Sequence, residues 1–268
     1  MLGSSRRQAT QLVLARCPYV HGNSRSSASA ARTSAGGFGD FTLHSYWRSS
    51  CSWRVRIALA HHGIQYGTNP VHLLKGGGEQ LQEAYKSGLN QLAQVPSLSF
   101  TDATGTVHTV TQSLAIISFL DAICSEGGSG ASPLVPGPAL ARARALQMAE
   151  VINSGIQPLQ NLATMKAIKA ATLVGTDEDV DGRGFATAAI QRGLVACERL
   201  AIASPGRFAV SDEVTVADVC LVPQLYNARR FKVDLSAFPR LIAAEAACKA
   251  LSSFEAATPD RQPDAEPE

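Results

Sequence analysis

Three adjacent residues, Ser49-Ser50-Cys51, form the segment of the sequence best suited to chemistry. They follow a segment with strand-like alternation and precede a segment with helical character, so we expect them at a strand-to-helix junction. The free N–H groups and the positive dipole end of a helix N-terminus favour an anion at such a place. A thiolate is such an anion, and hydroxyl groups that hydrogen-bond to its charged form would lower its pKa. The pattern indicates thiolate chemistry, with plain helix capping by serine as the alternative.

The elements around this segment predict a thioredoxin-like domain at residues 40–124, in the order βαβ-α-ββα. We expect strands at residues 41–46, 66–73, 94–100 and 107–110, and helices at residues 53–62, 79–87 and 112–121. The first helix should stop at Gly63, since glycine commonly follows the last helical turn. Parallel pairing of the first two strands needs a crossover helix, which this order supplies.

The rest of the chain shows only helical periodicity, which predicts an all-α domain at residues 139–256. A linker rich in Gly, Ser and Pro, residues 125–138, separates it from the first domain. The expected helices are residues 139–152, 157–173, 185–203, 216–226 and 242–251. Thr215-Val-Ala-Asp218 fits a variant of the capping box and is interpreted as structural. The predicted fold class is therefore α/β followed by all-α.

The two ends of the chain differ in composition from the rest. Residues 1–39 contain five arginines, many Ser and Ala, and no acidic residue, which is typical of a mitochondrial transit peptide. The alternative for this leader is a disordered extension, in which case we expect a cytoplasmic protein. Residues 257–268 are rich in proline and acidic side chains, and we expect a disordered tail there.

The bulk composition excludes several function classes. A formal net charge of +2 gives no sign of a polyanion binder, so we expect no nucleic-acid partner. No apolar run approaches the ~18 to 20 residues of a membrane-spanning helix, so we expect no membrane partner. The six cysteines form no C-x-x-C pair and lie near no histidines at zinc-finger spacing, so we expect no metal.

A longer segment around the Ser-Ser-Cys motif resembles the signature of the zeta-class glutathione transferases. It reads Ser45-Tyr-Trp-Arg-Ser-Ser-Cys-Ser-Trp-Arg-Val-Arg-Ile-Ala-Leu59. Further similar segments are Gln94-Val-Pro96, Gln112-Ser-Leu-Ala-Ile116, Gly155-Ile-Gln-Pro-Leu-Gln-Asn-Leu162, Asp212-Glu-Val-Thr-Val-Ala-Asp-Val-Cys-Leu-Val-Pro223 and Arg230-Phe-Lys-Val-Asp-Leu235. The resemblance spans about residues 41–263 and implies a thioredoxin-like domain, a helical C-terminal domain, glutathione as cofactor and a homodimer. The missing proline after Asn90 and the longer loop at residues 102–109 depart from the family pattern and affect geometry only.

The resemblance also implies which residues bind glutathione. These are Ser49, Ser50, Cys51, Ser52, Trp53, Arg54, Gln80, Val95, Gln112, Ser113, Gln157 and Asn161. The first three, which the resemblance makes catalytic, would surround the sulfur, with Ser50 as the main stabiliser of the thiolate. Val95 precedes an expected cis-proline, Pro96, and its backbone would pair with the tripeptide as an added strand. Gln112 and Ser113 would hold the γ-glutamyl carboxylate at a helix start, with capping as the alternative.

Two arginines, Arg48 and Arg230, are the residues expected to bind the substrate's carboxylates. A dianionic acid needs cationic hydrogen-bond donors, and arginine offers a planar fork. Arg229 competes with Arg230 for this role, and the alternative for Arg48 and Arg230 is a pair of solvated arginines at helix ends.

The activity implied by the resemblance is the glutathione-dependent cis–trans isomerisation of maleylacetoacetate to fumarylacetoacetate in phenylalanine and tyrosine catabolism. Glutathione transfer and dehalogenation of small α-haloacids are implied side activities. One alternative is a glutathione thioltransferase in which Cys51 itself attacks, since the same helix end would favour its ionisation. The other is a non-catalytic interaction module, against which the intact Ser49-Ser50-Cys51 and Gln112-Ser113 segments argue.

Overall fold

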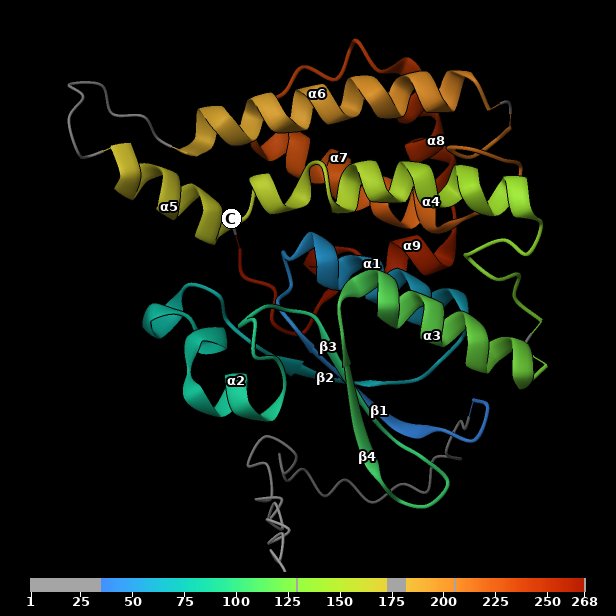
Figure 1. Cartoon of the computed structure of the whole chain (residues 1–268). Helices are drawn as coiled ribbons and strands as arrows, with labels where there is room; N and C mark the ends of the chain where they lie inside the picture. The colour runs from blue at the N-terminus through green and yellow to red at the C-terminus, as the bar shows by residue number, and fades with distance from the viewer. Residues whose placement is uncertain (1–34, 129, 173–181, 205, 268) are drawn as a thin grey trace, which may run out of the picture.

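The computed structural model describes residues 35–128, 130–172, 182–204 and 206–267. In these residues, one domain contains a four-stranded sheet with its helices, and the other consists of helices (Figure 1). The predicted fold class, a thioredoxin-like α/β domain followed by an all-α domain, is confirmed. The predicted transit peptide lies outside the described residues, except for residues 35–39.

The sheet has the strand order β2-β1-β3-β4 and combines parallel with antiparallel pairs. Its strands are β1 (Gly39–Ser45), β2 (Gly67–Pro70), β3 (Ser97–Thr101) and β4 (Val107–Thr111). β1 pairs in parallel with β2 and antiparallel with β3, which in turn pairs antiparallel with β4. β2 is shorter than predicted because it ends at Pro70, which has no N–H to donate to the ladder.

The helices of the first domain place the Ser-Ser-Cys motif at the carboxyl end of β1. They are α1 (Ser50–His61), α2 (Glu83–Gly88) and α3 (Ser113–Glu126). Figure 1 shows α1 and α3 on the side of the sheet that faces the helical domain. α1 begins at Ser50 rather than at the predicted Trp53, because the Ser49 hydroxyl caps it by accepting from the N–H of Ser52 at 3.2 Å.

The second domain is built from six described α-helices. They are α4 (Ala139–Asn153), α5 (Leu162–Thr172), α6 (Gly182–Ile202), α7 (Val216–Arg230), α8 (Pro239–Lys249) and α9 (Ser252–Ala256). The helix predicted over residues 157–173 is instead a 3-10 turn, η4 (Gln157–Leu159), followed by α5. The interruption arises because the side chain of Asn161 accepts from the N–H of Ala163 at 2.9 Å and so starts a new helix.

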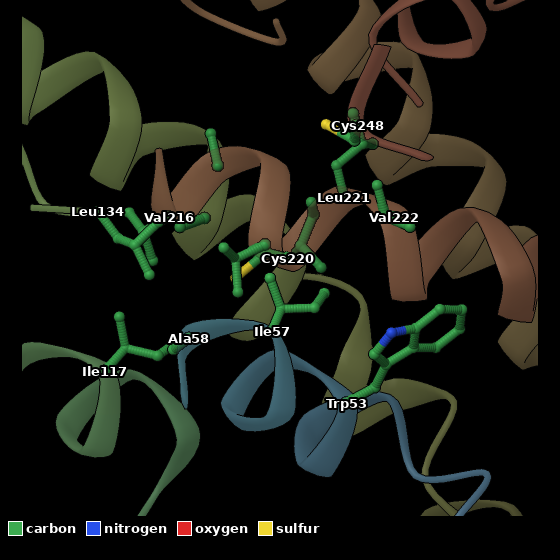
Figure 2. Packing of buried hydrophobic residues seen from close by; sticks show 14 of the residues in the cluster. Trp53, Ile57, Ala58, Ile117, Leu134, Val216, Cys220, Leu221, Val222 and Cys248 are labelled. Atoms are coloured by element: carbon green, nitrogen blue, oxygen red, sulfur yellow. The ribbon is translucent and has the colours of Figure 1, made fainter. Parts of the chain in front are cut away.

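A continuous hydrophobic core joins the two domains through α1 and α7. Trp53 and Tyr226 meet edge to face, with ring centroids 5.5 Å apart. Figure 2 shows Ala58, farther along α1, toward Val216 at the start of α7, so the two helices run in opposite directions. The end of α7 therefore lies beside the start of α1.

Both ends of the described chain pack on the first domain. Phe38, inside the predicted leader, packs against Phe100 and Phe119 with both centroid distances at 5.4 Å, so the folded region begins before residue 40. The prediction of a disordered tail is wrong for residues 257–267. An acidic, proline-rich segment lacks order when its side chains lack partners, but Asp264 here accepts from the N–H of Trp47 at 2.9 Å. None of the helices in the described ranges has the length and apolar character needed to cross a membrane.

The burial of His44 leads us to expect that the free energy of unfolding falls in weak acid. Its ring is 2% exposed within the sheet, hydrogen-bonds to Ser99 and Asn69, and has a pKa lowered by burial from 6.5 to about 4. As the pH falls, His44 is protonated in the unfolded chain before it is protonated in the folded one. The stabilisation is therefore complete above pH 6.5 and is lost as the pH approaches 4. The loss is on the order of 2–3 kcal/mol. We expect urea unfolding to show it in the wild type and to show a flatter pH profile for His44→Gln; identical profiles would contradict the assignment.

Candidate active site

The first turn of α1 separates the roles of its two serines. Ser49 is the N-cap, with extended backbone angles (φ −69°, ψ 118°), and its hydroxyl is engaged by the N–H of Ser52. Ser50 is 7% exposed, and its hydroxyl has no hydrogen-bond partner among the described residues. The first turn contains no acidic residue, so the positive end of the helix dipole is not neutralised there. Capping is therefore the role of Ser49, and Ser50 can donate to an anion.

The next three residues of the motif point their side chains into the protein. Ser52, Trp53 and Arg54 are 0%, 4% and 0% exposed, so their side chains pack inside the protein rather than at the surface of the site. The guanidinium of Arg54 donates from Nη1 to Ser113 at 3.3 Å and to Asn153 at 2.8 Å. It thereby fixes the start of α1 against the start of α3 and the end of α4. Arg54 positions the site rather than lining it.

The start of α3 is a second helix end suited to an anion. Gln112, the residue before it, has a left-handed backbone (φ 70°) and makes no capping bond with its side chain. Such a conformation in a non-glycine residue costs about 1–3 kcal/mol and is concentrated at functional sites. The first turn of α3 also lacks an acidic residue. Two unneutralised helix starts with the cation of Arg54 between them favour a ligand that carries carboxylates.

Val95 and Gln80 bring further unpaired polar groups to this region. The Val95–Pro96 peptide bond is cis, as the resemblance implies. The backbone N–H and C=O of Val95 form no hydrogen bond within the part of the chain that the structure describes, so an extended peptide can pair with them. Gln80, in η3 (Glu79–Leu81), donates to the carbonyl of Leu73 at 3.4 Å. Its Oε1 is a buried acceptor without a partner among the described residues.

The helical domain contributes the segment after α4. Gln157 begins η4 and is half-buried, while the side-chain oxygen of Asn161 caps α5, which leaves its amide N–H groups for a ligand. A buried pair missed by the sequence analysis, Gln160 and Gln224, fixes this segment to α7. Each amide donates to the other at 3.0 Å. No local sequence pattern distinguishes these two glutamines from exposed ones, because each is buried by its pairing with the other, which is distant in the sequence.

Arg229, the arginine that competes with Arg230 for the substrate, forms an ion pair with Glu245. Arg229 donates from Nη1 to the Glu245 carboxylate at 2.7 Å, and a second bond from Nη2 makes the pair bidentate. Glu245 is 3% exposed, so releasing Arg229 would leave a buried carboxylate with one cationic partner fewer. Arg229 is therefore the weaker choice for binding substrate.

Arg48 and Arg230 come from different domains. Arg230 follows Tyr226 by one helical turn, so both lie on one face of α7, and Tyr226 contacts Trp53 in α1. Arg48 directly precedes the Ser49 cap, and its guanidinium stacks over the Trp47 ring at 4.8 Å from the ring centroid. Arg48 therefore lies beside Ser50, and Arg230 lies one helical turn beyond Tyr226, the α7 residue that contacts Trp53.

The described cysteines fall into two groups. Cys124, Cys197, Cys220 and Cys248 are buried, whereas Cys51 is half-buried in the first turn of α1. Burial raises the pKa of Cys197 to about 12 and that of Cys220 to about 11, so both stay protonated near neutral pH. No cluster of His, Cys, Asp or Glu within the described ranges is suited to a metal ion. Among the described cysteines, Cys51 is the one in the first turn of α1, so a thiolate there comes from Cys51 or from a bound thiol.

Comparison with known proteins identifies a family with this architecture. Residues 48–123 match the glutathione S-transferase N-terminal domain. The chain is 42% identical over 222 residues to the maleylacetoacetate isomerase of Rattus norvegicus, which covers 83% of this chain and 94% of that protein. The crystal structure of maleylacetoacetate isomerase from Anaeromyxobacter dehalogenans, with glutathione bound in its active site, superposes with a TM-score of 0.73. It is 40% identical, over 86% of this chain and 99% of that one.

A third solved structure indicates the class of glutathione transferase. A maleylpyruvate isomerase described as a bacterial glutathione transferase of the zeta class superposes with a TM-score of 0.72 at 35% identity, over 84% of this chain and 100% of that one. These matches include both domains in the same order. The chain therefore belongs to the zeta class of the glutathione transferases, the family that includes the maleylacetoacetate isomerases.

Proposed function

We propose that this chain is a glutathione-dependent isomerase that converts maleylacetoacetate to fumarylacetoacetate in phenylalanine and tyrosine catabolism. The observation that carries the proposal is the Ser50 hydroxyl, which has no partner among the described residues and lies at the unneutralised start of α1. The names of relatives at about 40% identity, among them the Rattus norvegicus and Anaeromyxobacter dehalogenans isomerases, support the choice of substrate.

The polar groups around α1 fit glutathione. Ser50 and the first-turn N–H groups would face its sulfur, and the backbone of Val95 would pair with its cysteinyl unit as an added strand. Gln112 and the N-terminus of α3 would take the γ-glutamyl carboxylate. Gln80, Ser113, Gln157 and Asn161 complete the proposed set. The left-handed backbone of Gln112 supports this fit, because costly conformations of this kind are concentrated at ligand-binding and catalytic sites.

The proposed mechanism divides the work between the cofactor and the chain. Bound glutathione would supply a thiolate nucleophile for reversible addition to the cis double bond, and addition would make that bond a single bond about which rotation is possible. Ser50 donates a hydrogen bond that stabilises the thiolate. Arg48 and Arg230 hold the two carboxylates of the substrate and so orient its double bond toward Ser50. Arg54, which is completely buried, keeps α1, α3 and α4 in fixed relative positions.

A direct assay tests the proposed function. Conversion of maleylacetoacetate should require glutathione and should not occur with S-methylglutathione, which has the same carboxylates but no ionisable thiol. The same preparation should be assayed for glutathione transfer and for dehalogenation of α-haloacids, which we propose as side activities. Isomerisation at an unchanged rate without glutathione, or none with it, would overturn the proposal.

Gln112→Gly is expected to stabilise the fold and to weaken glutathione binding. Glycine adopts a positive φ without steric penalty, so the free energy of unfolding should rise by about 1 kcal/mol. The variant also loses the amide proposed to hold the γ-glutamyl group, so the Kd for glutathione should rise about tenfold. Thermal unfolding and calorimetric titration measure the two effects. A variant that is less stable, or that binds glutathione as the wild type does, would contradict this account of Gln112.

We further propose a homodimer and a mitochondrial location, with the cytoplasm as the alternative location. The homodimer is supported by the resemblance to the zeta class. The location is supported by the arginine-rich, acid-free composition of residues 1–39. Light scattering of the purified protein tests the first proposal. Fractionation of the source cells with N-terminal sequencing of the native protein tests the second, and an intact leader in the cytoplasmic fraction would refute it.

A further inference from the structure

We infer that the C-terminal segment, residues 257–267, is a working part of the glutathione site, in which Asp264 acts as a positioning residue. The inference rests on the proposed function, because the loops that the segment holds are those proposed to bind glutathione. Figure 1 shows the segment returning, in red, toward the loop that precedes α1. Its contacts with the first domain are spread along its length rather than confined to one point.

The first attachment is through a buried arginine in α1. Arg56 is 1% exposed and donates from Nε to the carbonyl of Ala257 at 3.1 Å, where the segment begins. It also donates to the Ser45 hydroxyl at 3.2 Å and to the carbonyl of Trp47 at 2.9 Å. One guanidinium therefore links the C-terminal segment to the loop between β1 and α1.

The second attachment is a hydrogen bond between Asp264 and the backbone of Trp47, on the side opposite to Arg56. The N–H of Trp47 donates to Asp264 Oδ2 at 2.9 Å, while its C=O accepts from Arg56. Trp47 lies inside the tight turn closed by the bond from the Ser49 N–H to the Tyr46 carbonyl at 2.9 Å. Asp264 and Arg56 thus fix from both sides the turn that sets where Arg48 and the Ser49 cap lie.

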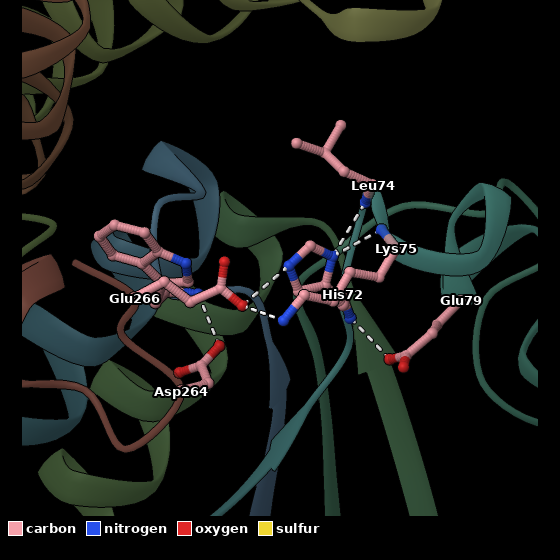
Figure 3. Close-up of polar contacts among 7 residues, drawn as sticks. His72, Leu74, Lys75, Glu79, Asp264 and Glu266 are labelled. Carbon is pink, nitrogen blue, oxygen red and sulfur yellow. Dashed lines mark hydrogen bonds and ion pairs between the residues drawn. The ribbon is translucent and has the colours of Figure 1, made fainter. Parts of the chain in front are cut away.

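The third attachment reaches the loop that carries Gln80. His72 accepts from the N–H groups of Leu74 and Lys75 through Nδ1, at 3.1 Å and 2.8 Å, so its Nε2 carries the proton. That Nε2 faces Glu266 at 3.4 Å, and Glu266 also pairs with the ammonium group of Lys75 (Figure 3). The backbone N–H of His72 donates to the Glu79 carboxylate at 2.7 Å, next to Gln80. Glu266 therefore joins the segment to a loop whose geometry sets the position of Gln80.

An apolar contact completes the arrangement. Tyr46, Trp47, Val71, Tyr85 and Val95 form a small core separate from the main one, and Ala265 of the segment packs against it. This core includes Val95, whose backbone is proposed to pair with glutathione. The eleven C-terminal residues from 257 to 267 thus contact the Trp47 turn, the Gln80 loop and the Val95 core, three of the structures proposed to surround the tripeptide.

Single substitutions in the full-length protein test this inference. Asp264→Ala should raise the Kd for glutathione about tenfold, since a partly buried backbone N–H loses its acceptor and the turn is released. Asp264→Asn keeps a carbonyl oxygen that can accept from the same N–H and should bind within about threefold of the wild type. Asp260→Ala is the matched control, because Asp260 is exposed in the same segment and should leave binding unchanged. In Asp264→Ala, turnover at saturating glutathione should change less than KM for glutathione.

Calorimetric titration with glutathione alone, together with thermal unfolding, separates the outcomes. Weaker binding by Asp264→Ala, with rescue by Asp264→Asn and a nearly unchanged Tm, supports the inference. Wild-type affinity in Asp264→Ala, or a fall in Tm without a change in Kd, overturns it, because the segment would then be merely structural. Failure of the wild type to bind glutathione would overturn the proposed function, and this inference with it, whereas the isomerase assay tests the proposed function without these variants.

Discussion

Ser50→Ala is expected to lower kcat/KM for the isomerisation by about a hundredfold, in line with the loss of one donor to a reacting anion. The hydroxyl of Ser50 is a donor at the start of α1 that is not used in capping, so its removal leaves the helix intact. Steady-state kinetics with glutathione and maleylacetoacetate measure the effect. The fall should be mainly in kcat, because the carboxylate contacts of both ligands lie elsewhere.

The neighbouring residues provide matched controls for this result. Ser49→Ala removes the cap and should lower the free energy of unfolding by about 1 kcal/mol, with a smaller effect on turnover. Cys51→Ala should reduce turnover by no more than about tenfold, because its thiol does not attack the substrate in the proposed mechanism. The reverse order, with Cys51→Ala inactive and Ser50→Ala mild, would favour the thioltransferase in which Cys51 attacks.

Asp218→Ala is expected to lower the free energy of unfolding by about 3–4 kcal/mol, enough to compromise folding of the whole helical domain. Asp218 is completely buried and accepts from the N–H groups of Ala209 at 2.8 Å and Thr215 at 3.0 Å. The capping box predicted at residues 215–218 is therefore confirmed, with an additional bond to Ala209 that the local pattern does not contain. Alanine would leave these two buried N–H groups without acceptors and would also remove the acceptor of the Thr215 hydroxyl and the Cys248 thiol.

Asp218→Asn separates the hydrogen bonds from the size of the side chain. Asparagine has nearly the same volume but only one acceptor oxygen. It can accept from one of the two N–H groups, while its own NH₂ group, also a donor, is directed at the other. We expect a loss between that of alanine and that of the wild type, measured by urea unfolding of the three proteins. Equal stability of Asp218→Ala and the wild type would show that the capping box does not hold α7 in place.

Features set by neighbours in the chain could be predicted from the sequence. The junction at Ser49-Ser50-Cys51 was placed correctly, because helix capping depends on residues three or four positions apart. The capping box at Thr215 was likewise confirmed, as was the cis bond before Pro96 that the family resemblance implies. The start of α1 was placed too late because the sequence cannot distinguish a serine that caps from a serine that begins the helix.

Features set by distant partners could not be predicted. Asp264 and Trp47 are 217 positions apart, and the acidic tail therefore resembles a segment without partners until the fold brings them together. Gln160 and Gln224, 64 positions apart, and Arg54 and Asn153, 99 positions apart, are similar cases. Arg54 shows the limit of the resemblance as well: its place in the motif suggests a ligand contact, whereas its burial makes it a bridge between three helices.

The chain's proposed chemistry depends on a thiol that loses its proton where β1 passes into α1, and titration of that thiol tests it most directly. The ultraviolet absorption of glutathione thiolate, recorded against pH on the wild-type complex and on the Ser50→Ala complex, gives the pKa in each. We expect the wild-type value to lie at least one unit below the ~8.5 of a free thiol and the Ser50→Ala value to return most of the way toward it. A bound thiol that titrates as it does in free glutathione would contradict the account.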